Sequence, residues 1–366
     1  MQPIKLLLQV IGFVSVLLLF FLGLELLDQS FQLMGRGRAE ALLATTSKPL
    51  VGLFIGILAT SLVQSSSTVT SMVVGLVAGG AVTVAGAIPI VMGANIGTSI
   101  TNTIVSLGHI TRKDEFERAM AGATVHDFFN IFAVAVFYPL ELMTGFLSRS
   151  ALVLAEGVSG IGGPRLLSPV QVVVTPIVEQ IVALVRANGI VVLVLGFVLL
   201  FGSLRFLIVL LRRFVFGRLE RFLHTYLIGT PGFAFLFGAL TTFSVQSSSI
   251  TTSMVVPLVG AGVVTVAQVF PFVMGANLGT TVTALLAALV LAGSGEPTGT
   301  AALEVAFVHL CFNAYGVLLL WPFKKVRAIP IRLAEKLGAL SARNRAYALG
   351  YIALVFFIIP LLFLLV

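Results

Sequence analysis

The chain has 366 residues, of which 58% belong to the hydrophobic set AVILMFWYC and only 10% are charged, and its mean hydropathy is +1.11. This composition excludes a soluble domain and predicts an all-α integral membrane protein in contact with lipid. The net charge of +8 does not indicate a nucleic-acid partner, because the basic residues cluster between apolar stretches, as the positive-inside bias requires.

Four uninterrupted apolar stretches approach or exceed the roughly 20 residues that cross a bilayer. They lie at about 4–24, 187–211, 305–323 and 346–366. The first has no small-residue cleavage site and is followed by Glu25 and Asp28, so we expect a retained helix rather than a signal peptide.

One polar segment occurs twice. Residues 64–101 recur at 246–283 without a gap, with 25 of 38 positions identical, and each copy begins with Gln-Ser-Ser-Ser. The apolar runs before the glutamines, 50–63 and 233–245, would span only about 20 Å as helices. Each copy therefore predicts a re-entrant helical hairpin with the serines near its tip.

A second polar stretch in each copy has the pattern Gly-Ala-Asn-x-Gly-Thr. Pro89 and Pro271 precede it, and it carries two glycines in each half. These residues predict an unwound segment in a discontinuous transmembrane helix, with backbone groups free to bind ligands.

A third shared element, His-x-x-Phe-Asn, follows each copy. It occupies His126 to Asn130 and His309 to Asn313, and we expect these His and Asn side chains to support the site from behind. Asp127 has Leu310 as its counterpart. An unmatched carboxylate in a membrane helix is a candidate cation ligand or charge compensator, the alternative being a hydrated position at a helix end.

Loop charges orient the two copies. The loop at 109–118 contains two arginines and a lysine, whereas its counterpart at 291–304 contains no Lys or Arg. We therefore expect the copies to have inverted topology, with the basic segments 205–221 and 324–345 as cytoplasmic loops, although the charges at 28–48 fit poorly.

The predicted organisation has five parts. They are an N-terminal helix and linker at 1–48, repeat 1 at 49–145, an extracellular connection, transmembrane helix and basic loop at 146–230, repeat 2 at 231–323, and a basic loop and C-terminal helix at 324–366.

The polar segments favour a particular chemistry. Hydroxyl, amide and carbonyl oxygens suit Na⁺ rather than zinc or copper, and helix N-termini suit an oxyanion. Neither 64–101 nor 246–283 contains Lys or Arg, so an anion there would need co-bound cations. The sequence therefore predicts cation-coupled transport without a cofactor.

The repeated Gln-Ser-Ser-Ser, the segment GANIGTSITNTIVSL and the segment RAMAGATVHDFFN resemble the type II sodium-dependent phosphate cotransporter family. The resemblance covers nearly all of about 50–141 and 233–324. It implies an inverted-repeat symporter that imports inorganic phosphate, electrogenic through Asp127, with three Na⁺ per divalent phosphate. The implied phosphate-site residues are Gln64, Ser65, Ser66, Ser67, Gln246, Ser247, Ser248 and Ser249. The implied sodium-site residues are Asn95, Thr98, Thr101, Asp127, Asn277, Thr280 and Thr283, with His126, Asn130, His309 and Asn313 behind them.

Three other interpretations stay open. A sodium-coupled dicarboxylate transporter uses similar hairpins, and a membrane sensor would bind phosphate without moving it. A serine hydrolase is disfavoured because no base is identifiable beside the serines. The connection at 146–184 has no cysteine, unlike the disulfide-bearing loop of animal relatives, so we expect a multi-pass protein of a bacterial inner (plasma) membrane.

Overall fold

A computed structural model describes residues 48–159, 176–196, 230–292 and 297–364, with short pieces between 11 and 33, at 174, and between 198 and 206. Every regular element in these ranges is a helix. The predicted helix at 4–24 lies mostly outside the described residues, and the basic segment 205–221 and the charges of the 28–48 linker lie almost wholly outside them.

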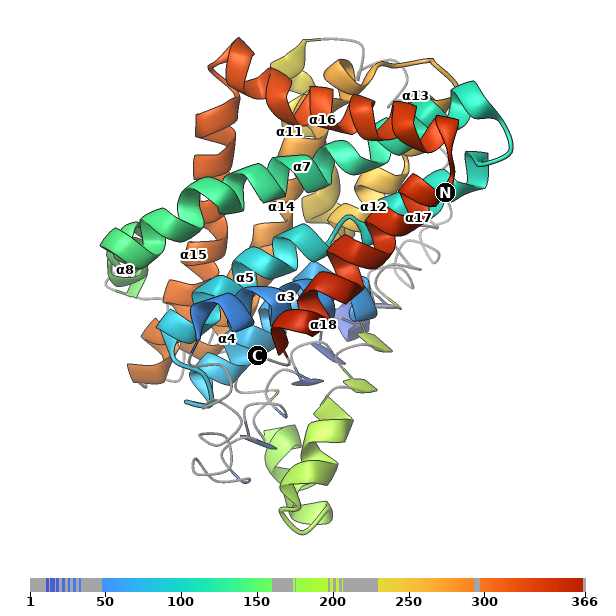
Figure 1. The fold of residues 1–366 in the computed structure, drawn as a ribbon. Coiled ribbons are helices and arrows are strands. Elements are labelled where there is room, and N and C mark those ends of the chain that lie inside the picture. The colour runs from blue at the N-terminus through green and yellow to red at the C-terminus, as the bar shows by residue number, and fades with distance from the viewer. Residues whose placement is uncertain are drawn as a thin grey trace.

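The helices follow one another in two similar series (Figure 1). The first series comprises α3 (Pro49–Val63), α4 (Ser66–Ala78), α5 (Val84–Gly97), α6 (Ile100–Ser106), the 3-10 turn η1 (Leu107–His109), α7 (Lys113–Thr144) and α8 (Phe146–Ser159). The second comprises α11 (Pro231–Val245), α12 (Ser248–Ser253), α13 (Val256–Gly260), α14 (Val266–Ala292) and α15 (Pro297–Leu320). The chain ends in α16 (Lys324–Arg343), α17 (Ala346–Ala353), the π-helical turn η2 (Leu354–Ile358) and α18 (Ile359–Leu364).

Five of the described helical segments are long and apolar enough to cross a membrane. They are Val84–His109, Lys113–Thr144, Val266–Leu289, Gly299–Leu320 and Ala346–Leu364. Two of the apolar stretches expected from the sequence, 305–323 and 346–366, fall on such segments. The helices before and after each Gln-Ser-Ser-Ser are shorter, as expected for elements that do not cross alone.

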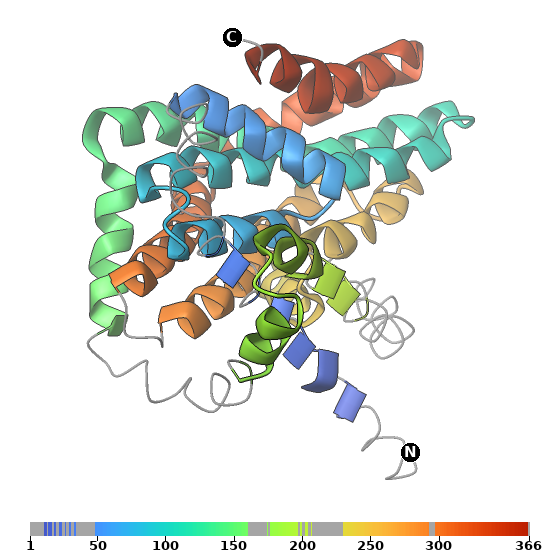
Figure 2. The same ribbon diagram turned by 90° about the horizontal axis from the view of Figure 1, so that it is seen from below.

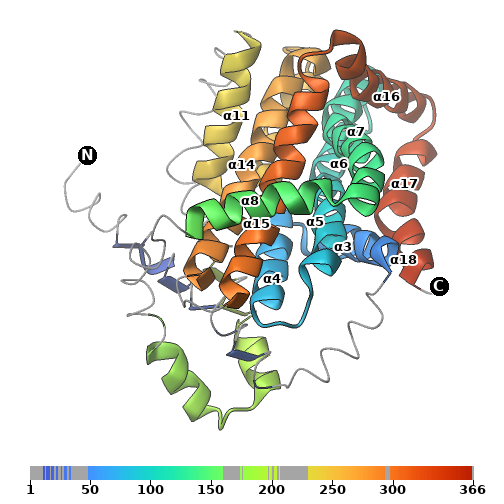
Figure 3. The same ribbon diagram turned by 90° about the vertical axis from the view of Figure 1, so that its left-hand side faces the viewer.

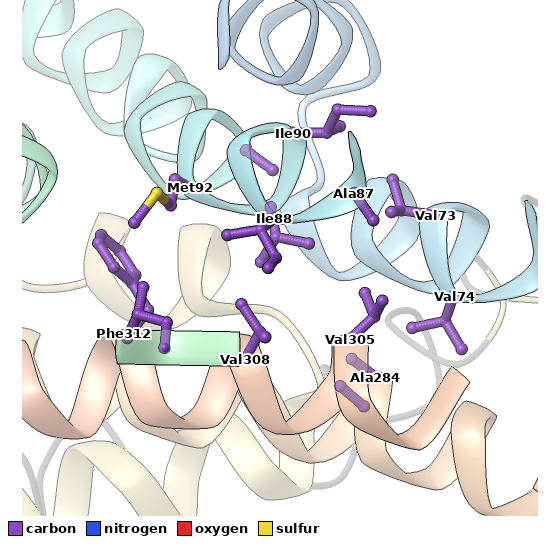
Figure 4. Close-up of a cluster of buried hydrophobic side chains, with 14 of the residues drawn as sticks. Val73, Val74, Ala87, Ile88, Ile90, Met92, Ala284, Val305, Val308 and Phe312 are labelled. Atoms are coloured by element: carbon purple, nitrogen blue, oxygen red, sulfur yellow. The ribbon is translucent and has the colours of Figure 1, made fainter. Parts of the chain in front are cut away.

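Each series packs its serine-rich helix against the other series. Helix α4 lies against α14 and α15, while α12 and α13 lie against α6 and α7. Figure 4 shows Val73 and Val74 of α4 and Ile88 of α5 facing Val305 and Val308 of α15 in one buried cluster. In Figure 3, α11, α14 and α15 stand side by side, and the lower end of α15 lies beside α4. The two series therefore share one core.

Helices α7 and α15, which carry the His-x-x-Phe-Asn elements, run in opposite directions where they meet. Gly316 of α15 lies against Phe129, and Phe312, earlier in α15, packs edge-on to Phe137, later in α7, with ring centroids 6.3 Å apart. Moving forward along α7 thus means moving backward along α15.

The expected unwound segments are not present. Helix α14 is continuous through Asn277, and the first series has only a two-residue interruption, at Thr98 and Ser99, between α5 and α6. The physical reason is that the glycines permit close helix packing: a Cβ on Gly93 would lie 1.9 Å from the Leu53 carbonyl oxygen, and one on Gly275 would lie 1.9 Å from that of Phe235. Glycine here brings α5 onto α3 and α14 onto α11.

The basic segment at 324–345, expected to be a loop, is mostly the amphipathic helix α16, which lies along α7 (Figure 1). Its small residues Ala334, Gly338 and Ala342 are buried, and a Cβ on Gly338 would lie 2.4 Å from the Glu117 carbonyl oxygen. Small residues at a four-residue spacing thus form one face of a helix packed on its neighbour.

The connection expected to begin at 146 also starts as a helix. Helix α7 ends at Gly145, which has φ +62°, and the Glu141 carboxylate accepts hydrogen bonds from the backbone N–H groups of Leu147 and Ser148 at the start of α8. Figure 2 shows α8 beside α15. Helix α8 therefore adds a wall to the core.

Candidate functional site

The two glutamines that open the repeated segments have the same uncommon backbone conformation. Gln64 has φ 57° and Gln246 has φ 53°, both left-handed. Each glutamine N–H donates to the threonine carbonyl four residues earlier, Thr60 at 2.7 Å and Thr242 at 2.6 Å. This conformation costs a non-glycine residue roughly 1–2 kcal/mol, and such strain is concentrated at functional sites. Both turns end one short helix and start the next.

The serines after Gln64 take different roles. Ser65 caps α4, because its Oγ accepts the Thr68 N–H at 3.3 Å. Ser66 and Ser67 are 3% and 2% exposed in the first turn of α4, where backbone N–H groups have no intrahelical partner. Gln64 itself is exposed. The buried serines, rather than the glutamine, lie inside the protein.

The second set is similar but its helix is interrupted. Ser248 and Ser249 are 2% and 4% exposed, while Gln246 and Ser247 are partly exposed. Pro257 separates α12 from α13, whereas Gly75 at the matching position leaves α4 continuous.

Hydrogen bonds join α12 to the first series. The Ser249 hydroxyl donates to the Thr98 carbonyl oxygen at 2.9 Å. The Asn102 amide and the Thr252 hydroxyl are hydrogen-bonded, with Nδ2 to Oγ1 at 2.8 Å, and the Ser253 hydroxyl donates to Asn102 Oδ1 at 2.9 Å. The second serine-rich helix is thus held against the end of α5 and the start of α6.

Four predicted asparagines form a single buried network with one histidine. Asn277 Nδ2 donates to Asn130 Oδ1 at 2.8 Å and to Asn313 Oδ1 at 2.9 Å. Asn130 in turn donates to the Asn95 carbonyl oxygen at 2.7 Å, and His309 Nε2 lies 3.3 Å from Asn95 Oδ1. Each of these five residues is at most 1% exposed. The structure therefore brings together residues that are 35 to 214 positions apart in the chain.

The other histidine predicted for the site, His126, contacts the network without a well-aligned hydrogen bond among the described residues. His126 is fully buried against Asn277, but neither ring nitrogen completes a well-aligned hydrogen bond among the described residues. His126 thus faces Asn277 much as His309 faces Asn95.

The predicted threonines fall into two kinds. The hydroxyls of Thr98 and Thr280 donate to carbonyl oxygens one turn earlier in their own helices, at 2.8 and 3.0 Å. Thr101 Oγ1 is buried and has no hydrogen-bond partner within the described part of the chain. Thr283 is 2% exposed.

Several other buried polar atoms also have no partner among the described residues. They are Thr60 Oγ1, Thr242 Oγ1, Asp127 Oδ1, His309 Nδ1 and Asn313 Nδ2. Unpaired buried polar atoms are unfavourable unless something binds them, and these supply neutral and anionic oxygens for a hard cation and ring and amide nitrogens for an anion.

Asp127 shares no hydrogen bond with the asparagine network among the described residues. It is fully buried in the middle of α7, so the alternative of a hydrated helix end is wrong. Its Oδ2 accepts a hydrogen bond of 2.9 Å from the Tyr351 hydroxyl of α17.

Sequence reasoning missed several residues of this site. Asn102 and Tyr351 have no counterpart in the other half, so a search for repeated residues does not find them. Thr60 and Thr242 do match each other at the spacing of the repeat, but they lie four positions before the repeated segments 64–101 and 246–283 begin. Each of these two threonines could be recognised as a hydroxyl side chain in an otherwise apolar run.

Comparison with known proteins is consistent with this geometry. The model of the Na⁺/Pi-cotransporter family matches residues 19–158 and 198–342. The chain is 34% identical to the human sodium-dependent phosphate transport protein 2B over 98% of its own length, and 36% identical to the rabbit (Oryctolagus cuniculus) protein 2A over 95%. It spans 65% of the length of each of these relatives. No solved structure matches the chain. With a family model that covers most of its residues, the chain belongs to the Na⁺/Pi-cotransporter family.

Proposed function

We propose that this protein imports inorganic phosphate together with sodium ions across a bacterial inner (plasma) membrane. The relatives named above are sodium-dependent phosphate transport proteins, and the buried site supplies the hydroxyl, amide and carboxylate groups that these two ions need. The observation that carries the proposal is the matched pair of strained turns at Gln64 and Gln246, each followed by buried serines in a helix that packs against the opposite series.

Phosphate binds, in this proposal, between the two serine-rich turns. Ser66, Ser67, Ser248 and Ser249 are each buried, which supports this placement, and hydroxyls together with the N–H groups of the first turn of α4 can donate to phosphate oxygens. All Lys and Arg residues lie outside the two repeated segments, so a divalent anion requires cations bound nearby.

Sodium ions bind, in this proposal, to other buried oxygens of the candidate site. Thr101 Oγ1 and Asp127 Oδ1 are buried and available, and the Asn95 and Asn277 amides lie in the central network. Three Na⁺ with one divalent phosphate would move one net positive charge inward per cycle, and Asp127 sets that charge.

The substitution Asp127→Gly tests this role of the carboxylate. We expect it to reduce or abolish the acceleration of phosphate uptake by an inside-negative potential. An unchanged charge moved per phosphate would contradict this role.

Transport proceeds by alternating access between inverted repeats. The reciprocal packing of α4 and α12–α13, and the opposite directions of α7 and α15, support a twofold relation between the halves. The paired short helices around each glutamine act as the re-entrant hairpins of this arrangement.

The decisive experiment is uptake of labelled phosphate into liposomes that contain the purified protein. An inward Na⁺ gradient is compared with K⁺ and with choline, with and without an inside-negative potential. We expect uptake that requires Na⁺ and is faster at negative potential. Phosphate binding without uptake would favour a membrane sensor. Uptake of a dicarboxylate instead of phosphate would show that the protein is a transporter with a different substrate.

Serine variants test the site itself. Ser66→Ala and Ser248→Ala should each lower phosphate uptake by at least tenfold while the protein still inserts and stays monodisperse, because each removes one donor to the anion. Ser244→Ala is the matched control, since Ser244 is exposed and its hydroxyl donates to the Leu240 carbonyl oxygen of its own helix. Normal uptake by both buried-serine variants would exclude a shared site.

A further inference from the structure

Tyr351 connects the C-terminal helix to the carboxylate of Asp127. The tyrosine hydroxyl donates to Asp127 Oδ2 at 2.9 Å, and the other oxygen, Oδ1, is buried without a partner among the described residues. Among these residues, Asp127 is the only buried Asp, Glu, Lys or Arg. One carboxylate oxygen is therefore held by a hydrogen bond, and the second can still bind a ligand.

Ring packing holds the tyrosine in this position. Its ring centroid lies 6.0 Å from that of Phe128 and 6.0 Å from that of Phe356, the latter with a T-shaped geometry. These contacts limit where the hydroxyl can point, so the hydrogen bond in turn limits how the carboxylate can rotate.

The helix that carries Tyr351 differs from the other membrane-spanning candidates. In the segment Ala346–Leu364, only 17% of the most apolar 18-residue stretch is buried, against 56% to 78% of the corresponding stretches in the other four segments. A π-helical turn, Leu354–Ile358, begins three residues after the tyrosine, and such turns within α-helices are often found at functional sites. The helix is thus a peripheral element, yet it reaches Asp127, the only buried carboxylate in the described part of the chain.

We propose that Tyr351 is a positioning residue for cation binding at Asp127. By occupying Oδ2, its hydroxyl aims Oδ1 into the protein as a sodium ligand, and it makes the C-terminal helix part of the coupling between sodium binding and transport. This inference rests on the proposed function.

The test is Tyr351→Phe, which removes the hydroxyl and keeps the ring contacts. We expect the sodium concentration for half-maximal phosphate uptake to rise about tenfold, with the phosphate concentration dependence at saturating sodium unchanged. A tenfold change corresponds to about 1.4 kcal/mol, close to the lower end for a hydrogen bond to a charged group. Tyr347→Phe is the matched control, because Tyr347 lies one turn earlier on the same helix and is 52% exposed.

A double-mutant comparison separates positioning from a general structural effect. In an Asp127→Asn background, Tyr351→Phe should cause no further change in the sodium dependence, because the hydroxyl acts only through that carboxylate. An equal additional loss in that background, or an unchanged sodium dependence of the single variant, would overturn the inference.

A binding measurement distinguishes this inference from the proposed function. Thermal unfolding of the purified protein in Na⁺ against K⁺ should show sodium-specific stabilisation that Tyr351→Phe weakens and Tyr347→Phe preserves. If uptake fails but this pattern persists, the positioning role stands and phosphate transport does not. If the wild-type protein shows neither sodium-dependent uptake nor sodium-specific stabilisation, both are refuted.

Discussion

Replacing Gly93 by alanine tests how the site is held in place. Its Cβ would lie 1.9 Å from the Leu53 carbonyl oxygen, whereas real Cβ atoms stay beyond 3.0 Å from such atoms, and the obstacle is backbone that cannot rotate away. Insertion of an atom into a well-packed core costs typically 1–3 kcal/mol, and alanine recovers about 0.5–1 kcal/mol of helix propensity. We therefore expect Gly93→Ala to lower the free energy of unfolding by roughly 2 kcal/mol.

The measurement is thermal unfolding of the purified protein in detergent, with Gly75→Ala as the matched control. Gly75 is also a buried helical glycine, but a Cβ there meets nothing within 4 Å, so alanine should be neutral or slightly stabilising. Gly275→Ala should behave like Gly93→Ala, because its Cβ would lie 1.9 Å from the Phe235 carbonyl oxygen. Equal unfolding temperatures for Gly93→Ala and Gly75→Ala would refute the close-packing argument. If Gly93→Ala instead abolished transport without changing the unfolding temperature, the result would favour the unwound segment that the sequence predicts around Gly93.

Three further substitutions test single side chains by thermal unfolding and by liposome uptake. Asn102→Ala should destabilise the protein by about 1 kcal/mol, because it removes the hydrogen bonds of Thr252 and Ser253 to the first series while the Thr252 hydroxyl still donates to the Ser248 carbonyl oxygen. An unchanged unfolding temperature would mean that this contact does not join the halves. Thr60→Val and Thr242→Val keep the side-chain shape but remove hydroxyls that have no partner within the described residues. We expect stability to be unchanged or higher by about 1 kcal/mol while uptake falls, and uptake equal to that of the exposed control Thr144→Val would exclude an ion-binding role for both hydroxyls.

The repeated sequence identified four asparagines that the structure brings together. Asn95, Asn130, Asn277 and Asn313 were chosen because each occurs at the same place in both halves, and the structure joins them with His309 in one network. Identical segments that fold alike and pack against each other place their polar residues at a common centre. These asparagines can therefore be identified from their positions in the sequence alone.

Backbone conformation was predicted less well, because glycine has two uses that look alike in a sequence. Gly93 and Gly275 can allow a helix to unwind, or they can allow another helix to approach, and the choice depends on whether a partner helix is present. The carbonyl oxygens of Leu53 and Phe235 are those partners. The helix α16 was missed for a related reason: its buried face consists of Ala334 and other small residues, which carry little hydrophobic signal beside many basic residues.

The residues that break the repeat give the two halves different roles, and only some of them could be predicted. Asp127 stands out in the sequence as an unmatched carboxylate, whereas Tyr351 and Asn102 carry no such signal. The matched turns, glycine contacts and asparagines form a framework that both halves share. Asp127 has an apolar counterpart in Leu310, and its partner Tyr351 lies beyond both repeats. If the halves exchange conformations during transport, a fully symmetric protein would have equal energies facing either side. Among the described residues, Asp127 is the only buried carboxylate, and its tyrosine partner has no equivalent in the other half. In our proposal these two residues make the two facing states unequal in energy and set the charge moved per cycle, while the sodium gradient and the membrane potential set the direction of transport.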